Sequence, residues 1–311
     1  MRKLISIVIP MYYEEEVIEK TYKTLTSEME KSSYDYELIF VDDGSLDNTF
    51  NIVKNKTIED KKCKCIKLSR NFGHQCATTA GINKSKGDAV VLIDADLQDP
   101  PYLIHKMLEK WEEGYDVVYG KRLNRDGESF FKLLSAKFFY KFLNYMSDTY
   151  IPENTGDFRL MDRKVVEAFN TMAEQNRFIR GMVSWTGFKQ IPLFYHREKR
   201  YAGKTKYPLK KMVRFATNGI FSFSTKPLKI MSYIGTFSII TSLVLLIYSF
   251  IQGLIGAASS GWASIMVTVT FLGGTNLLAM GILGSYIGRI YDETRNRPIY
   301  IIDEEINIDD L

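Results

Sequence analysis

Short apolar runs alternate with longer amphipathic stretches over residues 4–122. The runs are rich in β-branched residues and apolar on both sides, which is typical of buried parallel strands. Strands are predicted over Ile5–Pro10, Glu37–Val41, Cys65–Leu68, Ala89–Ile93 and Val117–Tyr119. Helices are predicted over Glu14–Glu30, Asp47–Asn55, Gln75–Asn83 and Pro101–Glu113. This alternation predicts an α/β fold with a doubly wound, mostly parallel sheet.

Two long apolar runs follow, about Ile230–Gln252 and Ala263–Ile287. Neither contains Asp, Glu, Lys or Arg, and each is long enough for the roughly 20 residues that cross a bilayer as a helix. A short uncharged segment joins them, so a transmembrane hairpin is predicted; a buried helical pair in a soluble protein is the alternative. Basic residues flank the outer ends, and the positive-inside rule places those ends in the cytoplasm: Lys226, Lys229, Arg289, Arg295 and Arg297.

A basic and apolar stretch, Tyr207–Phe223, precedes the hairpin. Lys210, Lys211 and Arg214 alternate with apolar residues at helical spacing, as in helices that lie in a membrane interface. An amphipathic helix packed on the α/β domain is the alternative. The predicted organisation is a cytosolic domain over residues 1–206, interfacial helices over 207–228, a transmembrane hairpin over 229–290 and a cytoplasmic tail over 291–311.

Composition narrows the function classes only a little. A hydrophobic content of 45% with 25% charged residues excludes wholesale disorder. The net charge of +4 is too small to indicate a nucleic-acid binder. Cys63, Cys65 and Cys76 are an odd, clustered set without a second Cys/His pair, so they indicate a reducing compartment rather than disulfides or a zinc site.

Polar motifs follow four of the predicted strands, and three of them are acidic. They are Pro10-Met-Tyr12-Tyr-Glu14, Asp42-Asp43-Gly44-Ser45, Asp94-Ala-Asp96-Leu-Gln98-Asp99-Pro-Pro and Gly120-Lys-Arg122. In such a sheet ligands bind beyond the carboxyl ends of the strands. The motifs therefore predict one crevice that is lined by carboxylates and faced by a guanidinium. The first turn has no glycine, which argues against a dinucleotide-binding fold.

Asp94 and Asp96 form the strongest candidate for a metal site. Clustered carboxylates repel one another unless a positive group lies among them, and their oxygens are the ligands that Mg²⁺ or Mn²⁺ prefers. A solvated turn is the alternative, but the apolar strand before the pair and the double proline after it favour the metal. His74 and His196 have no partner pattern and are predicted to be structural.

The ordered set of motifs resembles glycosyltransferase family 2, which has the GT-A fold. Within that family, Val41–Ser45 and Asp94–Pro101 resemble the polyprenyl-phosphate glycosyltransferases, such as dolichol-phosphate mannose synthase and the bactoprenol glucosyltransferases. The resemblance extends to Gly156–Leu160, Asn176–Gly181 and Arg200–Tyr207, and to the two apolar C-terminal runs. It covers nearly the whole chain, and the hairpin favours the bacterial glucosyltransferase branch.

The resemblance implies an inverting transferase that moves glucose from UDP-glucose onto undecaprenyl phosphate at the cytoplasmic face of the bacterial inner membrane. It implies Mg²⁺ or Mn²⁺ as cofactor, held by Asp94, Asp96 and Gln98. The nucleotide sugar would be bound by Pro10, Tyr12, Glu14, Asp42 and Asp94, with Arg200 and Lys206 closing over the phosphates. The acceptor phosphate would be bound by Arg122, by Arg125 or Lys132, and by Ser135. The resemblance also implies two catalytic residues: Asp157, at the position of the family's catalytic base, and Asp96.

Two residue roles stay open. An alkyl phosphate is largely dianionic at neutral pH, so Asp157 need not remove a proton and could instead orient a sugar hydroxyl or the acceptor. A salt bridge between Asp157 and Arg159 or Arg163 is the ordinary structural alternative. Arg122 could likewise be a counter-ion to Asp94 or Asp96 instead of a ligand of the acceptor.

The donor and the partners stay open as well. UDP-N-acetylglucosamine or another nucleotide sugar is an alternative donor. A catalytically idle membrane scaffold for a flippase or a downstream transferase is the alternative from another class, and the clustered carboxylates argue against it. Small residues on the second apolar run favour helix packing, either within the hairpin or in a homo-oligomer: Gly273, Gly274, Gly281, Gly284 and Gly288.

Overall fold

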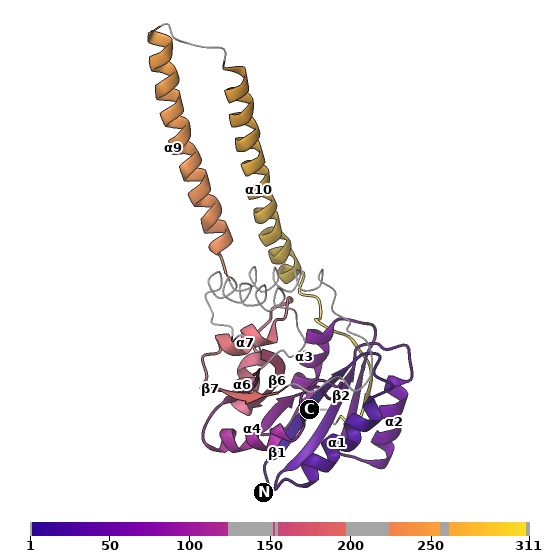
Figure 1. Cartoon of the computed structure of the whole chain (residues 1–311). Helices are drawn as coiled ribbons and strands as arrows, with labels where there is room; N and C mark the ends of the chain where they lie inside the picture. Colours follow the sequence, from indigo (N-terminus) through magenta and orange to yellow (C-terminus); the bar gives the residue numbers. More distant parts are fainter. Residues whose placement is uncertain (1, 124–151, 153–154, 197–223, 256–260, 309–311) are drawn as a thin grey trace.

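The computed structural model describes residues 2–123, 152, 155–196, 224–255 and 261–308. It consists of an α/β domain and a helical hairpin that projects from it (Figure 1). The strands are β1 (Leu4–Met11), β2 (Asp35–Asp42), β3 (Cys63–Leu68), β4 (Ala89–Leu92), β5 (Val117–Arg122), β6 (Thr155–Asp162), β7 (Gln190–Tyr195) and β8 (Ile302–Ile306). The domain helices are α1 (Ile18–Glu30), α2 (Thr49–Glu59), α3 (His74–Lys84), α4 (Leu103–Glu112), α6 (Arg163–Asn170) and α7 (Ile179–Trp185).

The eight strands form one sheet in the order β7-β5-β6-β4-β1-β2-β3-β8. β1 lies at its centre and pairs in parallel with both β2 and β4, and β2 pairs in parallel with β3. β6 runs antiparallel between β4 and β5, and β8 runs antiparallel along β3. The predicted doubly wound, mostly parallel sheet of the GT-A kind is therefore confirmed.

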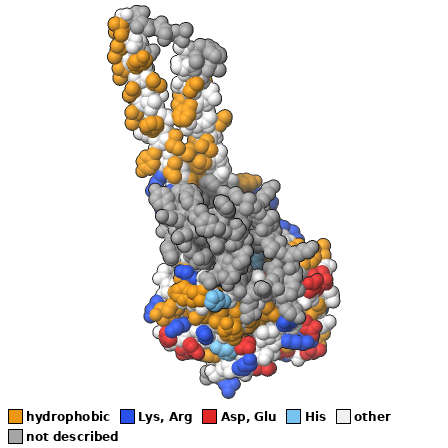
Figure 2. All heavy atoms as spheres, viewed as in Figure 1, with side chains coloured by type: hydrophobic (Ala, Val, Ile, Leu, Met, Phe, Trp, Pro, Cys, Tyr) orange, Lys and Arg blue, Asp and Glu red, His pale blue; other side chains and the backbone are white. Residues whose placement is uncertain are grey.

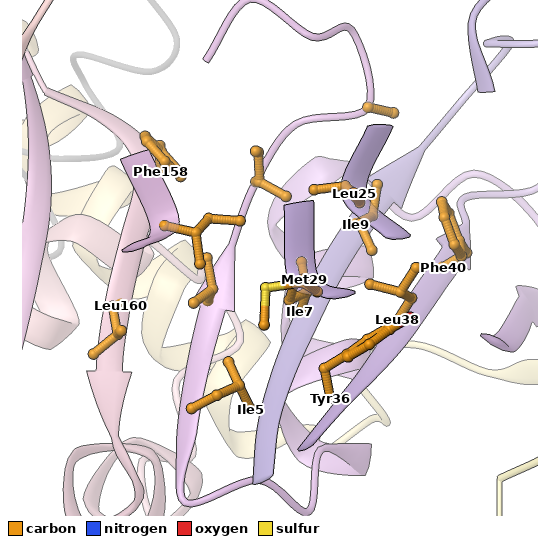
Figure 3. Close-up of a cluster of buried hydrophobic side chains, with 14 of the residues drawn as sticks. Ile5, Ile7, Ile9, Leu25, Met29, Tyr36, Leu38, Phe40, Phe158 and Leu160 are labelled. Atoms are coloured by element: carbon orange, nitrogen blue, oxygen red, sulfur yellow. The ribbon is translucent and has the colours of Figure 1, made fainter. Parts of the chain in front are cut away.

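Apolar side chains cover both faces of the sheet, because alternate residues of each buried strand point to opposite sides. Ile7 and Ile9 of β1 belong to the core under α1, α2 and α4, while Val8 belongs to the core under α3, α6 and α7. Figure 3 shows the first of these cores, in which Met29 of α1 lies close to Ile7. The strands thus had to be apolar on both sides, as their sequences are.

Helix α3 packs unusually close to the sheet. A Cβ atom built on Gly81 would lie 2.3 Å from Val8 Cγ1 and 3.1 Å from Val41 Cγ2. Only a residue without a side chain fits this approach. The close packing fixes α3 against β1 and β2, and its first residue, His74, lies at the end of the sheet where those strands finish.

The parallel strands run toward the hairpin. The N-terminus, where β1 begins, lies at the end of the domain far from the hairpin (Figure 1). The carboxyl ends of β1, β2, β4 and β5, which carry the predicted site, therefore lie on the side of the domain that faces it.

The hairpin consists of α9 (Lys226–Leu254) and α10 (Trp262–Thr294), which contain the two predicted apolar runs. Both helices are long and apolar enough to cross a membrane, and their apolar windows are not buried inside the protein. Figure 2 shows hydrophobic side chains along the hairpin, with acidic and basic side chains gathered on the domain. The predicted pair of apolar helices is confirmed, whereas residues 207–223, predicted as interfacial helix, lie outside the described residues.

The small residues of α10 do not pack against α9. A Cβ atom built on Gly273, Gly281 or Gly284 would have no atom within 4 Å, apart from the helix's own backbone. Within the described part of the hairpin, this face is thus left to lipid or to another chain.

The tail after α10 adds a strand that the sequence does not reveal. β8 pairs with β3, with Cys65 opposite Ile306. Lys54 Nζ lies 2.6 Å from Glu304 Oε1, and Lys84 Nζ lies 2.9 Å from Glu305 Oε1. Residues 302–306 of the predicted cytoplasmic tail are therefore part of the sheet of the α/β domain.

Asn307 holds the end of this strand. Its Nδ2 donates to the backbone oxygens of Thr57 (2.8 Å) and Cys63 (2.9 Å), and its Oδ1 accepts from Lys61. Its backbone has a φ of 58°, in the left-handed region that asparagine and glycine tolerate best. One side chain thus joins the tail to the two ends of the α2–β3 connection.

Asn307→Ala is expected to destabilise the domain by about 2 kcal/mol, because it removes three side-chain hydrogen bonds and strains a left-handed backbone. Asn307→Gly removes the same bonds without the strain and should cost less. Thermal unfolding of the full chain in detergent measures both variants. Equal melting temperatures for Asn307→Ala and wild type would contradict this role.

Candidate active site

The carboxyl ends of β1, β2, β4 and β5 bring most of the predicted site residues together. Tyr12 and Glu14 follow β1, Asp42 ends β2, Asp94 and Asp96 follow β4, and Arg122 ends β5. Strand β6 adds Asp157, α3 adds His74 and Gln75, and α7 adds Arg180. Arg125, Lys132, Ser135, Arg200 and Lys206 lie outside the described residues, so their predicted roles stay predictions.

Asp42 organises the turn that follows β1. Its buried carboxylate accepts from the Ser45 hydroxyl and from Ser45 N (3.1 Å), and Ser45 Oγ accepts from Tyr13 N (3.0 Å). Burial raises the pKa of Asp42, and the hydrogen bonds from Ser45 oppose that rise. Tyr12 and Glu14 are half-exposed beside it. Contact between Asp42 and a nucleotide stays a prediction, and the support that Asp42 gives to this turn is observed.

Gly44 is required by the turn that follows β2. Its φ is +73°, and a Cβ atom built there would lie 2.5 Å from the carbonyl carbon of Arg70. Next to it, the Asp43 carboxylate accepts from Phe72 N (2.7 Å) and Gly73 N (3.0 Å). The end of β2 is thereby joined to the start of α3, which carries His74.

Asp94 and Asp96 lie in the loop after β4. Asp96 is almost buried, and its Oδ1 accepts from Gln98 N at 3.1 Å. The pKa of Asp94 is raised to about 6, first by burial and then by the neighbouring carboxylates Asp99, Asp157 and Asp96, against the opposing effect of His74. About a third of the Asp94 side chain nonetheless reaches solvent. Asp94 is therefore a reachable carboxylate whose charge the protein only partly balances.

These carboxylates fit a divalent cation. Among the described residues no three His, Cys, Asp or Glu side chains form a complete metal site. The negative potential that raises the pKa of Asp94 would be relieved by a cation. Carboxylate oxygens are the donors that Mg²⁺ and Mn²⁺ prefer, with substrate oxygens and water as the remaining ligands. Asp94 and Asp96 would hold the ion.

Asp157 is surrounded by donors. Arg180 Nε lies 2.8 Å from Asp157 Oδ1, and Gln75 Nε2 donates to Oδ2 at 3.1 Å. His74 Nε2 lies 3.3 Å from Asp157 Oδ2 and 3.6 Å from Asp94 Oδ1. His74 thus has two carboxylate partners that its sequence context does not reveal. Among the described arginines, Arg180 forms the ion pair with Asp157, whereas the guanidinium groups of Arg159 and Arg163 bind backbone oxygens.

Asp157 and His74 stabilise each other's charged forms, and Arg180 also stabilises that of Asp157. Burial alone would raise the pKa of Asp157, but Arg180 and His74 outweigh it and hold that pKa well below its usual value. Burial alone would lower the pKa of His74, but Asp157 and Asp94 raise it to about 9. Asp157 is therefore a carboxylate and His74 a cation at neutral pH. A carboxylate this acidic is better suited to orienting a ligand than to accepting a proton.

Arg122 lies beside a different carboxylate from those predicted. Its Nη2 is 3.6 Å from Asp99 Oδ1, and its Nε donates to the Tyr195 hydroxyl at 3.2 Å. Asp94 and Asp96, the counter-ions considered from sequence, form no ion pair with Arg122 among the described residues. The Arg122 side chain is about one-fifth exposed, so it contacts the buried Asp99 and still reaches solvent.

Sequence comparison identifies relatives along almost the whole chain. The profile of Glycosyl transferase family 2 matches residues 6–169. The uncharacterized glycosyltransferase YkcC of Bacillus subtilis (strain 168) is 48% identical over 98% of this chain and 94% of its own. The prophage bactoprenol glucosyl transferase homolog of Escherichia coli (strain K12) is 42% identical over 96% and 98%. The SfII prophage-derived bactoprenol glucosyl transferase of Shigella flexneri is 42% identical over 96% and 97%.

Removing Arg180 is expected to leave Asp157 as a buried carboxylate without its main counter-ion. Arg180→Met should therefore lower the free energy of unfolding by about 3 kcal/mol. Asp157→Asn combined with Arg180→Met should restore part of that loss, because no buried charge is then left unpaired. A double-mutant cycle on unfolding in detergent measures the coupling. Strictly additive single effects would show that the pair contributes no coupling energy.

Proposed function

The chain belongs to glycosyltransferase family 2, and on that premise we propose that it transfers glucose from UDP-glucose to undecaprenyl phosphate. The observation that carries the proposal is the group of charged side chains at the strand ends. It combines partly balanced carboxylates with the Arg122 guanidinium, and it lies on the side of the domain that faces the hairpin. The bactoprenol glucosyl transferases among the relatives support glucose and a polyprenyl phosphate as substrates.

The donor binds at the ends of β1, β2 and β4. Tyr12 offers its ring to the uracil, Asp42 and Glu14 accept hydrogen bonds from the nucleoside, and Pro10 shapes the turn before them. Asp94, Asp96 and Gln98 would hold Mg²⁺ or Mn²⁺, and the bound ion would supply positive charge beside the departing UDP. Arg200 and Lys206 close over the phosphates.

The acceptor phosphate binds at the end of β5. Arg122 provides a planar guanidinium that matches phosphate geometry, and Arg125 or Lys132 adds a second positive charge, with Ser135 as a further donor. A phosphate oxygen attacks the anomeric carbon from the face opposite UDP. The new carbon–oxygen bond forms as the bond to UDP breaks, so the configuration inverts. The attacking phosphate is dianionic, and Asp157 therefore orients the reactants and need not take a proton.

The hairpin brings the enzyme to its lipid substrate. Helices α9 and α10 cross the bacterial inner membrane with their outer ends in the cytoplasm, as the flanking basic residues indicate. The α/β domain then lies on the cytoplasmic face, where nucleotide sugars are found. The small-residue face of α10, which α9 does not cover, is suited to contact with a second copy of the chain or with a flippase.

A transfer assay tests the proposed reaction. The purified full chain in detergent should convert labelled UDP-glucose and undecaprenyl phosphate to a labelled lipid when Mn²⁺ or Mg²⁺ is present, and chelation should stop it. Asp96→Asn should abolish transfer while the protein still melts as wild type, since the change removes one ligand charge. UDP-N-acetylglucosamine in parallel tests the alternative donor. Absence of transfer from any nucleotide sugar would favour the scaffold alternative.

Arg122→Ala separates acceptor binding from donor binding. The change removes up to two charge-assisted hydrogen bonds, each worth about 1.5–3 kcal/mol, so the KM for undecaprenyl phosphate should rise steeply. Arg122→Lys should restore only part of the loss, because an ammonium keeps the charge without the planar fork. Titration of UDP-glucose and Mn²⁺ without lipid should match wild type. A large loss of donor affinity would contradict the acceptor role of Arg122.

A further inference from the structure

Tyr195 lies beside Arg122 at the ends of two paired strands. β5 and β7 are parallel neighbours, and their register pairs Arg122 with Tyr195. The Tyr195 hydroxyl accepts a hydrogen bond from Arg122 Nε (3.2 Å) and donates one to Asp99 Oδ1. One phenol oxygen therefore connects the guanidinium to a carboxylate.

Asp99 is a carboxylate in a fully buried position, which is energetically unfavourable. Its side chain is fully buried, its Oδ1 lies 3.6 Å from Arg122 Nη2, and its Oδ2 has no hydrogen-bond partner within the described part of the chain. A buried carboxylate is strongly unfavourable unless a positive charge and hydrogen bonds compensate for lost hydration. Among the described residues, the Arg122 guanidinium and the Tyr195 hydroxyl supply that compensation. The three side chains therefore stabilise one another.

Two glycines, one on β5 and one on β6, leave the space that the Tyr195 ring and the Arg122 guanidinium occupy. A Cβ atom built on Gly120 would lie 2.9 Å from Tyr195 Cε1, and one built on Gly156 would lie 2.8 Å from Arg122 Nη2. The Tyr195 ring also packs edge-on against Phe158, with ring centroids 6.0 Å apart. A side chain at either glycine position would therefore collide with the Tyr195 ring or with the Arg122 guanidinium.

We infer that Tyr195 and Asp99 are positioning residues, which orient the Arg122 guanidinium toward the acceptor phosphate. The inference rests on the proposed function, because it assigns these residues to the acceptor site. The described contacts of Arg122 use Nε and Nη2, which leaves Nη1 to bind a phosphate oxygen. Asp99 also follows Asp94 and Asp96 in the same loop, so the loop that holds the donor's metal fixes the acceptor's guanidinium as well.

Tyr195→Phe tests this role with little change to the core, because it keeps the ring and removes only the hydroxyl. The KM for undecaprenyl phosphate should rise at least about fivefold, since the lost bond involves a charged group. The affinity for UDP-glucose, measured without lipid, should stay at the wild-type value. Tyr36→Phe is the matched control, because Tyr36 belongs to the same apolar core but lies near the start of β2. It should leave both constants unchanged.

Combining the variants shows whether Tyr195 acts through Arg122. In an Arg122→Ala background, Tyr195→Phe should cause no further rise in the acceptor KM, whereas a general packing role predicts an additional loss. Asp99→Asn keeps the side-chain volume but removes the charge, and it should raise the acceptor KM in the same direction. It serves as the second test if Tyr195→Phe does not fold.

The outcomes separate this inference from the proposed function. A wild-type acceptor KM in Arg122→Ala would overturn the acceptor site itself and the inference with it. A raised KM in Arg122→Ala, together with wild-type values in Tyr195→Phe and Asp99→Asn, would overturn the inference alone.

Discussion

Repulsion between carboxylates is the constraint on which this site depends. The protein gathers Asp94, Asp96, Asp99 and Asp157 at one edge of a sheet, and the pKa of Asp94 is raised by burial and by the charges of the other three carboxylates. Asp157 is compensated by Arg180 and His74, and Asp99 by Arg122. His74 compensates Asp94 only in part, and a divalent cation suits the position of Asp94. The start of α3, helix α7 and the end of strand β5 deliver the compensating groups.

In the proposed reaction, donor and acceptor bind at different strands of this sheet edge. The proposed donor side is formed by β1, β2 and β4, where Asp42 and Ser45 hold the turn that contains Tyr12. The proposed acceptor side is formed by β5 and β7 around Arg122. Both regions lie at the carboxyl ends of parallel strands, which face the hairpin (Figure 1). In the proposed reaction, a phosphate carried on a membrane lipid therefore reaches the site from the side of the hairpin.

The sequence predicts the elements that have a strong local pattern. β1 to β5 and the hairpin were recognisable because their apolar runs are long or regularly spaced, and the Asp94–Asp96 pair because it directly follows one such run. β8 has the sequence Ile-Asp-Glu-Glu-Ile and is stable only through β3, Lys54 and Lys84, which are distant in sequence. The contacts of His74 with Asp157, and of Arg122 with Asp99 and Tyr195, likewise join residues from separate elements. No spacing rule relates such residues, so only the fold reveals them.

The central claim is that a lipid phosphate displaces UDP in a single step within this crevice. The configuration at the anomeric carbon of the lipid product tests that claim most directly, since UDP-glucose carries an α linkage and one displacement inverts it. Nuclear magnetic resonance of the product formed from UDP-glucose and undecaprenyl phosphate should show the coupling of a β-linked anomeric proton. An α-linked product would contradict single displacement and require a second nucleophile in the site.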